Sequence, residues 1–227
     1  MNDDALGAQL AQLCSLDDHT RRRLYDFVAA QPEPVSRDTI SSALDIDRSL
    51  AAYHLDKLVD NGLLTASFAR PEGRTGPGAG RPAKHYARAA AEVHVSLPAR
   101  DYRLVAELLA RAVGADDTGA VRAALHAAAA RYGRGLGADA ANDLTTVVRR
   151  HGYEPYRDGD VLRLRNCPFH SIAREHVELV CGMNLALMRG LLTALGEDDN
   201  ADAVLDPAPD RCCVAFIDTY DRHRDRH

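Results

Sequence analysis

The sequence predicts an α+β protein in which two mixed helix-and-strand regions flank a helical one. Three observations lead to this prediction. Short amphipathic helical patterns fill the first 60 residues and two β-forming segments follow them, residues 96–150 are helical and rich in alanine, and β-forming segments return after residue 152 around an apolar helix. The expected parts are residues 1–90, a helical linker or dimerisation region at 91–151, a small α+β domain at 152–217, and a polar tail at 218–227 that does not order.

Composition and charge exclude several classes of protein. The chain has 227 residues and a net charge of −5, so it is not a uniformly basic protein that coats nucleic acid. No apolar run approaches the roughly 20 residues that span a bilayer, and the N-terminus lacks the basic and apolar regions of a secretory signal. We therefore expect a cytoplasmic protein with no membrane partner. Its five cysteines are expected to be thiols, metal ligands or redox groups rather than disulfides.

Three short helices are expected before residue 62. Ser15 and Asp18 resemble a capping box at the start of the first helix, Ser36 can cap the second, and Asp47 can cap the third. The third helix stops at Asn61-Gly62, because glycine tolerates the left-handed conformation of a helix end. Its inward face is expected to consist of apolar residues at i, i + 4 and i + 7, namely Ala51, Leu55 and Leu58.

Two strands, Leu63–Phe68 and Lys84–Arg88, follow with a Gly- and Pro-rich segment between them. Helix, turn, helix and hairpin in this order form a winged helix-turn-helix, whose last helix fits the major groove. Residues 48–88 contain seven basic and three acidic residues, and such a local basic patch favours contact with phosphates. The DNA-binding residues are expected on the outer face of the third helix and on the wing: Arg48, Ser49, Tyr53, His54, Lys57, Arg70, Arg74, Arg81 and Lys84.

The middle region is expected to form three helices. Ser96 and Pro98 fit the start of the first, the alanine-dense segment 118–132 forms the second, and the third runs from about residue 140 to Gly152. Alanine density favours a close approach of helices. We expect these helices to join two copies of the chain in a homodimer.

The last part combines strands with one long helix. Residues 153–157 and 161–165 flank Asp158-Gly159, which is a strong hairpin signal. One helix and two further strands are expected after this hairpin, at His170–Leu195, Ala203–Asp206 and Cys212–Ile217.

Four of the five cysteines lie within 47 residues of this part: Cys167, Cys181, Cys212 and Cys213. Thiolates bind zinc, copper(I) and iron–sulfur clusters, although the spacing matches no compact zinc template. Burial as small hydrophobic side chains is the alternative, and it is the role expected of Cys14.

Geometry sets a condition on joint ligation by these cysteines. A straight helix from Phe169 to Cys181 would separate its ends by roughly 18 Å. The chain around Cys167 must therefore fold back along the helix, or the helix must break at Cys181-Gly182. Cys212 and Cys213 would face opposite sides of a strand, so one of them, preferably Cys212, would face the site.

Two sets of segments resemble known regulators. The sequence SLAAYHLDKLVDNGLL at 49–64 resembles the recognition helix of ArsR-type winged-helix repressors, and GRPAKHY at 80–86 resembles their second wing strand. NCPFH at 166–170, HVELVCGMN at 176–184 and RCCV at 211–214 resemble the C-terminal half of SufR-type iron–sulfur regulators.

The second resemblance implies a dimeric repressor that holds a cluster through three cysteines. Carried over, the ligands would be Cys167, Cys181 and either Cys212 or Cys213. His170, His176 or an exogenous group would complete the set.

Together these observations predict a homodimeric regulator, of the repressor kind, that binds double-stranded operator DNA under the control of an iron–sulfur cluster or a metal. A zinc site, a thiol switch, and an apolar small-molecule pocket with structural cysteines remain alternatives. We do not expect an enzyme. Cys167 and His170 could supply a nucleophile and a base, but nothing marks an oxyanion site or a phosphate loop.

Overall fold

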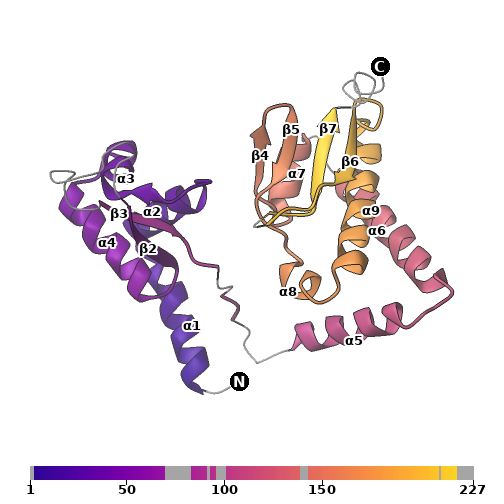
Figure 1. Cartoon of the computed structure of the whole chain (residues 1–227), viewed down its shortest axis with the longest axis horizontal. Helices are drawn as coiled ribbons and strands as arrows, with labels where there is room; N and C mark the ends of the chain where they lie inside the picture. Colours follow the sequence, from indigo (N-terminus) through magenta and orange to yellow (C-terminus); the bar gives the residue numbers. More distant parts are fainter. Residues whose placement is uncertain are drawn as a thin grey trace. The chain divides into compact units, whose positions relative to one another are not determined.

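A computed structural model of the chain describes residues 3–69, 83–90, 93–95, 101–138, 143–209 and 211–218. The chain divides into two compact units, residues 1–100 and 101–227 (Figure 1). Both units combine helices with a small antiparallel sheet, so the predicted α+β class is confirmed. The helices expected in a linker or dimerisation region at 91–151 pack within the second unit.

The first unit is a winged helix-turn-helix, as predicted. Its sheet has the order β1-β3-β2, and all its strand pairs are antiparallel. Tyr86 of β3 lies opposite Val35 on one side and Ala66 on the other, so β3 is the central strand. The elements in chain order are α1 (Asp3–Ser15), α2 (His19–Ala29), β1 (Val35–Ser36), α3 (Arg37–Leu44), α4 (Arg48–Asp60), β2 (Leu64–Ala69) and β3 (Ala83–Arg88).

Local hydrogen bonds explain where these helices begin. The side chain of Asp18 accepts a hydrogen bond from the Arg21 backbone at the start of α2, and Asp47 accepts two from the start of α4. The prediction that Ser15 caps the first helix is wrong, because Ser15 is the last residue of an additional helix, α1. No helix was expected before residue 15.

The core of the first unit lies between its helices and sheet. Ala51, Leu55 and Leu58 are completely buried, so the inward face predicted for α4 is confirmed. They pack with Leu24 of α2 and Tyr86 of β3. Cys14, which we expected to be buried, is exposed on α1.

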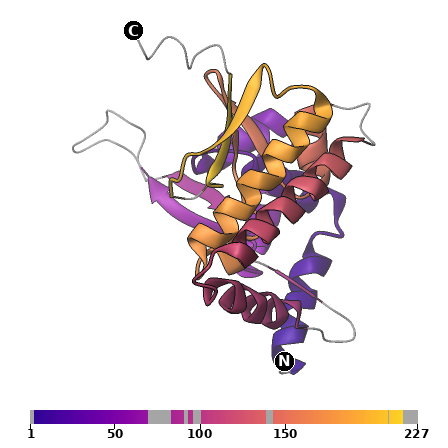
Figure 2. The same cartoon turned by 90° about the vertical axis from the view of Figure 1, so that its right-hand side faces the viewer.

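The second unit packs helices against a four-stranded antiparallel sheet of order β4-β5-β7-β6. Helix α9 lies against this sheet, and α6 runs beside α9 (Figures 1 and 2). The elements are α5 (Tyr102–Gly114), α6 (Ala120–Ala138), α7 (Leu144–Arg150), β4 (Pro155–Asp158), β5 (Val161–Leu164), α8 (His170–Ala173), α9 (Val177–Leu195), β6 (Ala201–Leu205) and β7 (Val214–Asp218).

Glycines let α6 and α9 approach each other closely. A Cβ atom on Gly133 of α6 would lie 2.0 Å from the backbone oxygen of Leu187, and one on Gly190 of α9 would lie 2.1 Å from that of Ala130. No side chain fits in either place. The close approach expected from the alanine-dense segment is therefore present, and glycines at the crossing make it possible.

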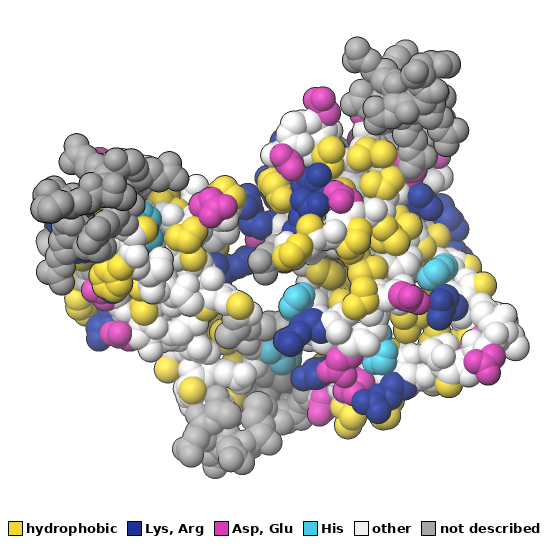
Figure 3. Space-filling view, in the orientation of Figure 1, with side chains coloured by type: hydrophobic (Ala, Val, Ile, Leu, Met, Phe, Trp, Pro, Cys, Tyr) yellow, Lys and Arg dark blue, Asp and Glu magenta, His cyan; other side chains and the backbone are white. Residues whose placement is uncertain are grey.

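Helix α9 is the centre of this unit. By length and composition alone it could cross a membrane. It contributes buried residues to the main core, including Leu187, Met188, Leu191 and Leu192, so packing within the unit accounts for its apolar character. On the face of the second unit seen in Figure 3, hydrophobic side chains gather around α9 and the neighbouring strands.

Several boundaries in the second unit differ from the prediction. Helix α5 is capped by Asp101, whereas Ser96 and Pro98 lie outside the described residues. The long helix expected from His170 is two helices, and the break falls at 174–176 rather than at Cys181-Gly182. Most of the polar tail, residues 219–227, also lies outside the described residues.

Candidate functional site

The outer face of α4 presents four of the residues that we expected to contact DNA. Arg48, Ser49, Tyr53 and Lys57 are all exposed, and Tyr53 keeps 56% of its surface accessible. Leu50, in the first turn of α4, is 46% exposed and was not among the residues expected on this face. An apolar side chain at this position could contact a thymine methyl group.

His54 does not belong to this face. Only 7% of its surface is accessible, and its Nδ1 atom is buried without a hydrogen-bond partner in the structure. Its ring lies 5.2 Å from that of Tyr53, edge to face. The prediction of an exposed His54 is wrong, because this position lies at the border of the buried face of α4 and not on the outer face with Tyr53.

An ion pair joins the two helices of the helix-turn-helix. The guanidinium of Arg48 in α4 donates a hydrogen bond to the carboxylate of Asp38 in α3. This hydrogen bond holds the pKa of Asp38 below its ordinary value. Both side chains are 65% exposed, and ion pairs in such positions contribute little to stability. Arg48 can therefore exchange Asp38 for a DNA phosphate.

Lys84 joins the wing to α4. Its Nζ atom donates a hydrogen bond of 2.6 Å to Asp56 in α4, and the hydroxyl of Tyr86 donates one of 3.0 Å to the same oxygen. Burial opposes ionisation of Asp56, but the two hydrogen bonds outweigh it and lower the pKa. Burial and the Asp56 carboxylate raise the pKa of Tyr86 to about 12. In this structure Lys84 thus orients β3 on α4.

Three further predicted DNA contacts belong to the sequence between β2 and β3. Arg70, Arg74 and Arg81 lie outside the described residues. Their contact with DNA stays a prediction.

The thiols of four cysteines gather in the second unit, although they come from three separate segments. Hydrogen bonds between sulfurs join Cys167 to Cys212, Cys212 to Cys213, and Cys213 to Cys181. None of them forms a disulfide. Cys212 is buried and the other three are partly buried.

The backbone explains how these segments meet. Cys181 stands in the second turn of α9, while Cys212 and Cys213 lie just before β7. The Cys212 backbone donates to the Leu164 oxygen (2.9 Å), which holds this segment beside the end of β5. Cys167 follows β5, and the break between α8 and α9 lets this part of the chain turn back. The geometric condition for bringing Cys167 to the other thiols is met in this way.

A buried polar pair lies under the thiols. The Tyr153 hydroxyl donates a hydrogen bond of 2.7 Å to Oδ1 of Asn184, and Nδ2 of Asn184 donates one of 3.3 Å to the sulfur of Cys212. Asn184 is completely buried in α9. Neither residue was identified from the sequence, although an asparagine inside an apolar helix is a signal of a buried hydrogen bond.

Electrostatics single out Cys212 among the four cysteines. Hydrogen bonds from Cys167 and Cys213, and further ones from the backbone and Asn184, lower the pKa of Cys212. The hydrogen bond to Cys212 and burial raise the pKa of Cys167 and of Cys213. Burial raises the pKa of Tyr153. The donors around its sulfur, which include the Asn184 amide, therefore favour the thiolate form of Cys212.

The histidines are placed differently from the thiols. His170 is exposed at the start of α8, and Nε2 of His176 is buried without a hydrogen-bond partner in the structure. Among the described residues, no three His, Cys, Asp or Glu side chains are arranged as a ready-made site for a single metal ion. The geometry thus provides a group of soft donors without a preformed mononuclear centre.

Comparison with known proteins bears on the first unit. A family model described as a helix-turn-helix domain matches residues 16–65, which run from the end of α1 to the start of β2. No curated protein and no solved structure matches the chain. The match supports a DNA-binding transcriptional regulator rather than an enzyme. It ends before the cysteines, so the resemblance of the second unit to SufR-type regulators stays a prediction.

Proposed function

We propose that the chain is a transcriptional repressor whose affinity for operator DNA is controlled by an iron–sulfur cluster held in its second unit. The observation that carries this proposal is the gathering of four free thiols from three segments that are distant in the sequence. Soft thiolate donors are the usual ligands of such clusters. A cluster of this kind would make the protein responsive to iron supply and oxidants.

The arrangement of the thiols favours a cluster over a single zinc ion. A tetrahedral zinc site with Zn–S bonds of about 2.3 Å places all four sulfurs about 3.8 Å from one another. Among the described residues, however, no three His, Cys, Asp or Glu side chains are grouped closely enough to hold one metal ion. Donors that are spread more widely suit a larger group with several iron atoms better than a single ion.

Residues of the chain would tune this site. Cys167, Cys181 and Cys212 are the proposed ligands, with Cys213 as the alternative to Cys212. The Asn184 amide donates to the Cys212 sulfur, and hydrogen bonds to ligating sulfurs adjust cluster potentials. Tyr153 holds that amide in place from its other end.

The path from the thiols toward DNA runs through α8 and α5. Cys167 lies three residues before α8, and Glu175 just after α8 accepts a hydrogen bond of 3.1 Å from Arg103 in α5. Helix α5 is the first element after the winged helix-turn-helix unit in the sequence. Release of Cys167 from Cys212 would free the segment that carries α8, and α5 would then favour a second position. The cluster can change DNA affinity only if it binds these two states of the protein with different affinity.

The test is anaerobic purification of the full chain with absorption spectroscopy and analysis of iron, sulfide and zinc. We expect visible absorption with iron and acid-labile sulfide, and loss of both in Cys167→Ser and Cys181→Ser. Cys14→Ser is the matched control, since Cys14 is an exposed thiol of the other unit. A colourless protein without iron refutes the proposal, and bound zinc alone would replace the cluster by a zinc site.

DNA binding is tested separately by a gel shift in a salt series. We expect affinity to fall steeply as salt rises, because phosphate contacts release counterions. We also expect the loaded and unloaded proteins to differ in affinity. Equal affinity of the loaded and unloaded proteins for DNA would mean that the cluster does not control DNA binding.

A further inference from the structure

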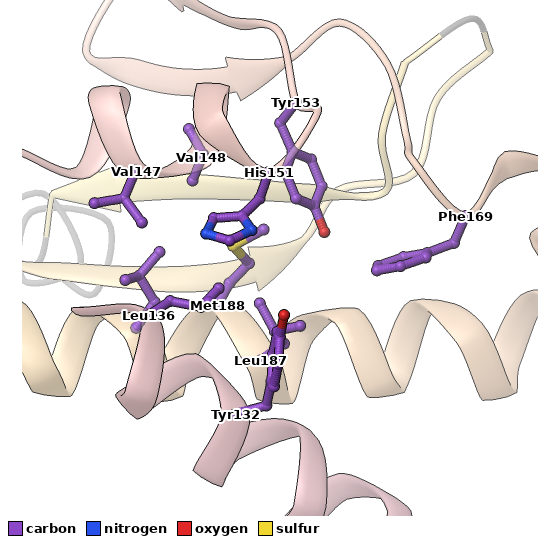
Figure 4. A pocket seen from close by; sticks show the side chains of 10 residues that line it. Tyr132, Leu136, Val147, Val148, His151, Tyr153, Phe169, Leu187 and Met188 are labelled. Atoms are coloured by element: carbon purple, nitrogen blue, oxygen red, sulfur yellow. The ribbon is translucent and has the colours of Figure 1, made fainter. Parts of the chain in front are cut away.

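A pocket of about 200 Å³ opens in the second unit next to the buried Tyr153–Asn184 pair. Residues of α6, α7 and α9 line it together with the segments around Tyr153 and Phe169 (Figure 4). We propose that this pocket binds a neutral, single-ring organic compound that carries one polar group, such as a phenol. The proposed cluster site does not use this pocket.

The floor of the pocket is apolar and firmly packed. Val148, Met188 and Leu191 are each 1% exposed, and all three belong to the main core of the unit. An enclosed apolar cavity of about 150 Å³ can stay dry and bind benzene. A pocket of about 200 Å³ therefore has room for one ring and a small substituent.

The walls favour an aromatic ligand. The rings of Tyr153 and Phe169 meet edge to face, with centroids 6.3 Å apart and planes at 82°. Figure 4 shows Phe169 and Tyr132 on two sides of the space and the sulfur of Met188 close to the His151 ring. Ring edges and a thioether form favourable contacts with a further aromatic ring.

The residues at the opening of the pocket favour an uncharged ligand. Tyr132 and His151 are exposed at the edge of the pocket and offer a hydroxyl and an imidazole. Among the described residues that line it, none is Asp, Glu, Lys or Arg. A charged ligand would lose its hydration without gaining an opposite charge, so a neutral compound with one hydrogen-bonding group is favoured.

The pocket and the thiol site share Tyr153. The ring of Tyr153 lines the pocket, while its hydroxyl holds Asn184, which contacts Cys212. An occupant pressing on this ring would move the residue that orients the Cys212 sulfur. This consequence rests on the proposed function, whereas binding in the pocket does not.

Methionine methyl NMR tests the binding directly on the full chain. The sequence has three methionines, of which Met188 lines the pocket and Met183, on the same helix, does not. With ¹³C-methyl-labelled methionine and phenol as the probe, we expect the Met188 signal to shift and saturate with a Kd below about 1 mM. The Met183 signal should stay in place.

Two variants make the test specific. Leu136→Phe fills the pocket from α6, and Leu185→Phe is a matched change at a partly buried leucine that packs on the same core outside the pocket. We expect Leu136→Phe to abolish the Met188 shift and Leu185→Phe to retain it. An unchanged shift in Leu136→Phe, no saturable shift in the wild type, or equally tight binding of benzoate would each overturn the proposal. Iron and sulfide measured on the same sample test the cluster independently.

Discussion

Replacing Gly133 by alanine should separate α6 from α9 and destabilise the second unit. The new Cβ atom would lie 2.0 Å from the Leu187 backbone oxygen and 2.9 Å from its carbonyl carbon. An unstrained contact of these atoms needs more than 3 Å, so the helices must move apart by roughly 1 Å. Overpacking a core usually costs 1–3 kcal/mol, and here backbone rather than a flexible side chain must yield. We therefore expect a loss of about 3 kcal/mol or more.

Gly135→Ala is the matched control on the same helix. Gly135 is exposed, and nothing lies within 4 Å of a Cβ atom built there. Alanine should stabilise α6 at this position by roughly 0.5–1 kcal/mol, because it removes the backbone freedom of glycine in the unfolded chain. The two substitutions add the same methyl group two residues apart, yet they should change stability in opposite directions.

Native-state hydrogen exchange of peptides from α6 and α9 measures this effect within the second unit. Gly133→Ala should lower the protection of both helices, whereas Gly135→Ala should leave or raise it. Thermal unfolding of the full chain by circular dichroism gives a second measurement. If the two variants behave alike, the close crossing of α6 and α9 does not exist as described, and the placement of Cys181 and Asn184 on α9 loses its basis.

Three other substitutions test the two sites. Leu50→Ala should weaken binding to a duplex selected from a random library by roughly fivefold, since about 1 kcal/mol of apolar contact is lost. Replacing thymine by uracil in that duplex should weaken binding of the wild type but not of the variant. The control, Leu10→Ala on α1, should bind the duplex as the wild type does. Asp56→Asn should make the free energy of unfolding of the first unit depend less on pH in acid. The pKa of Asp56 in the folded protein lies below 3.8, so its carboxylate gives stability that is present above pH 3.8 and lost as the pH falls through that lower pKa. Tyr153→Phe should destabilise the second unit by about 1–3 kcal/mol in denaturant unfolding, because it leaves the buried oxygen of Asn184 without a donor; unchanged stability would mean that this hydrogen bond is absent.

The elements of the first unit were predictable because short-range signals determine them. Ser36 and Asp47 cap their helices as expected, and the period of Ala51, Leu55 and Leu58 identified the buried face of α4. His54 was misplaced because it borders that face, and periodicity assigns such border positions poorly. Helix α1 was missed because its apolar residues form no clear stripe, and in the structure Leu10 and Leu13 are partly accessible to solvent.

Contacts between distant segments could not be derived from local patterns. Nothing in the sequence around Lys84 shows that its ammonium reaches Asp56 on another element. The gathering of the cysteines depended on a condition that spacing alone left open, namely where the helix after Cys167 breaks. The helix breaks at 174–176, and α9 then continues unbroken past Cys181.

Asn184 shows how a departure from a pattern can mark a site. Most residues of α9 near it are apolar, and an asparagine that replaces one of them must find hydrogen bonds or lose stability. Its partners are the Tyr153 hydroxyl and the Cys212 sulfur, so both halves of its amide are used. A leucine would satisfy the core equally well and would leave the Cys212 sulfur without this donor. The polar residue is therefore explained by the thiol that it contacts, and local patterns are most often broken where a functional group has to be held.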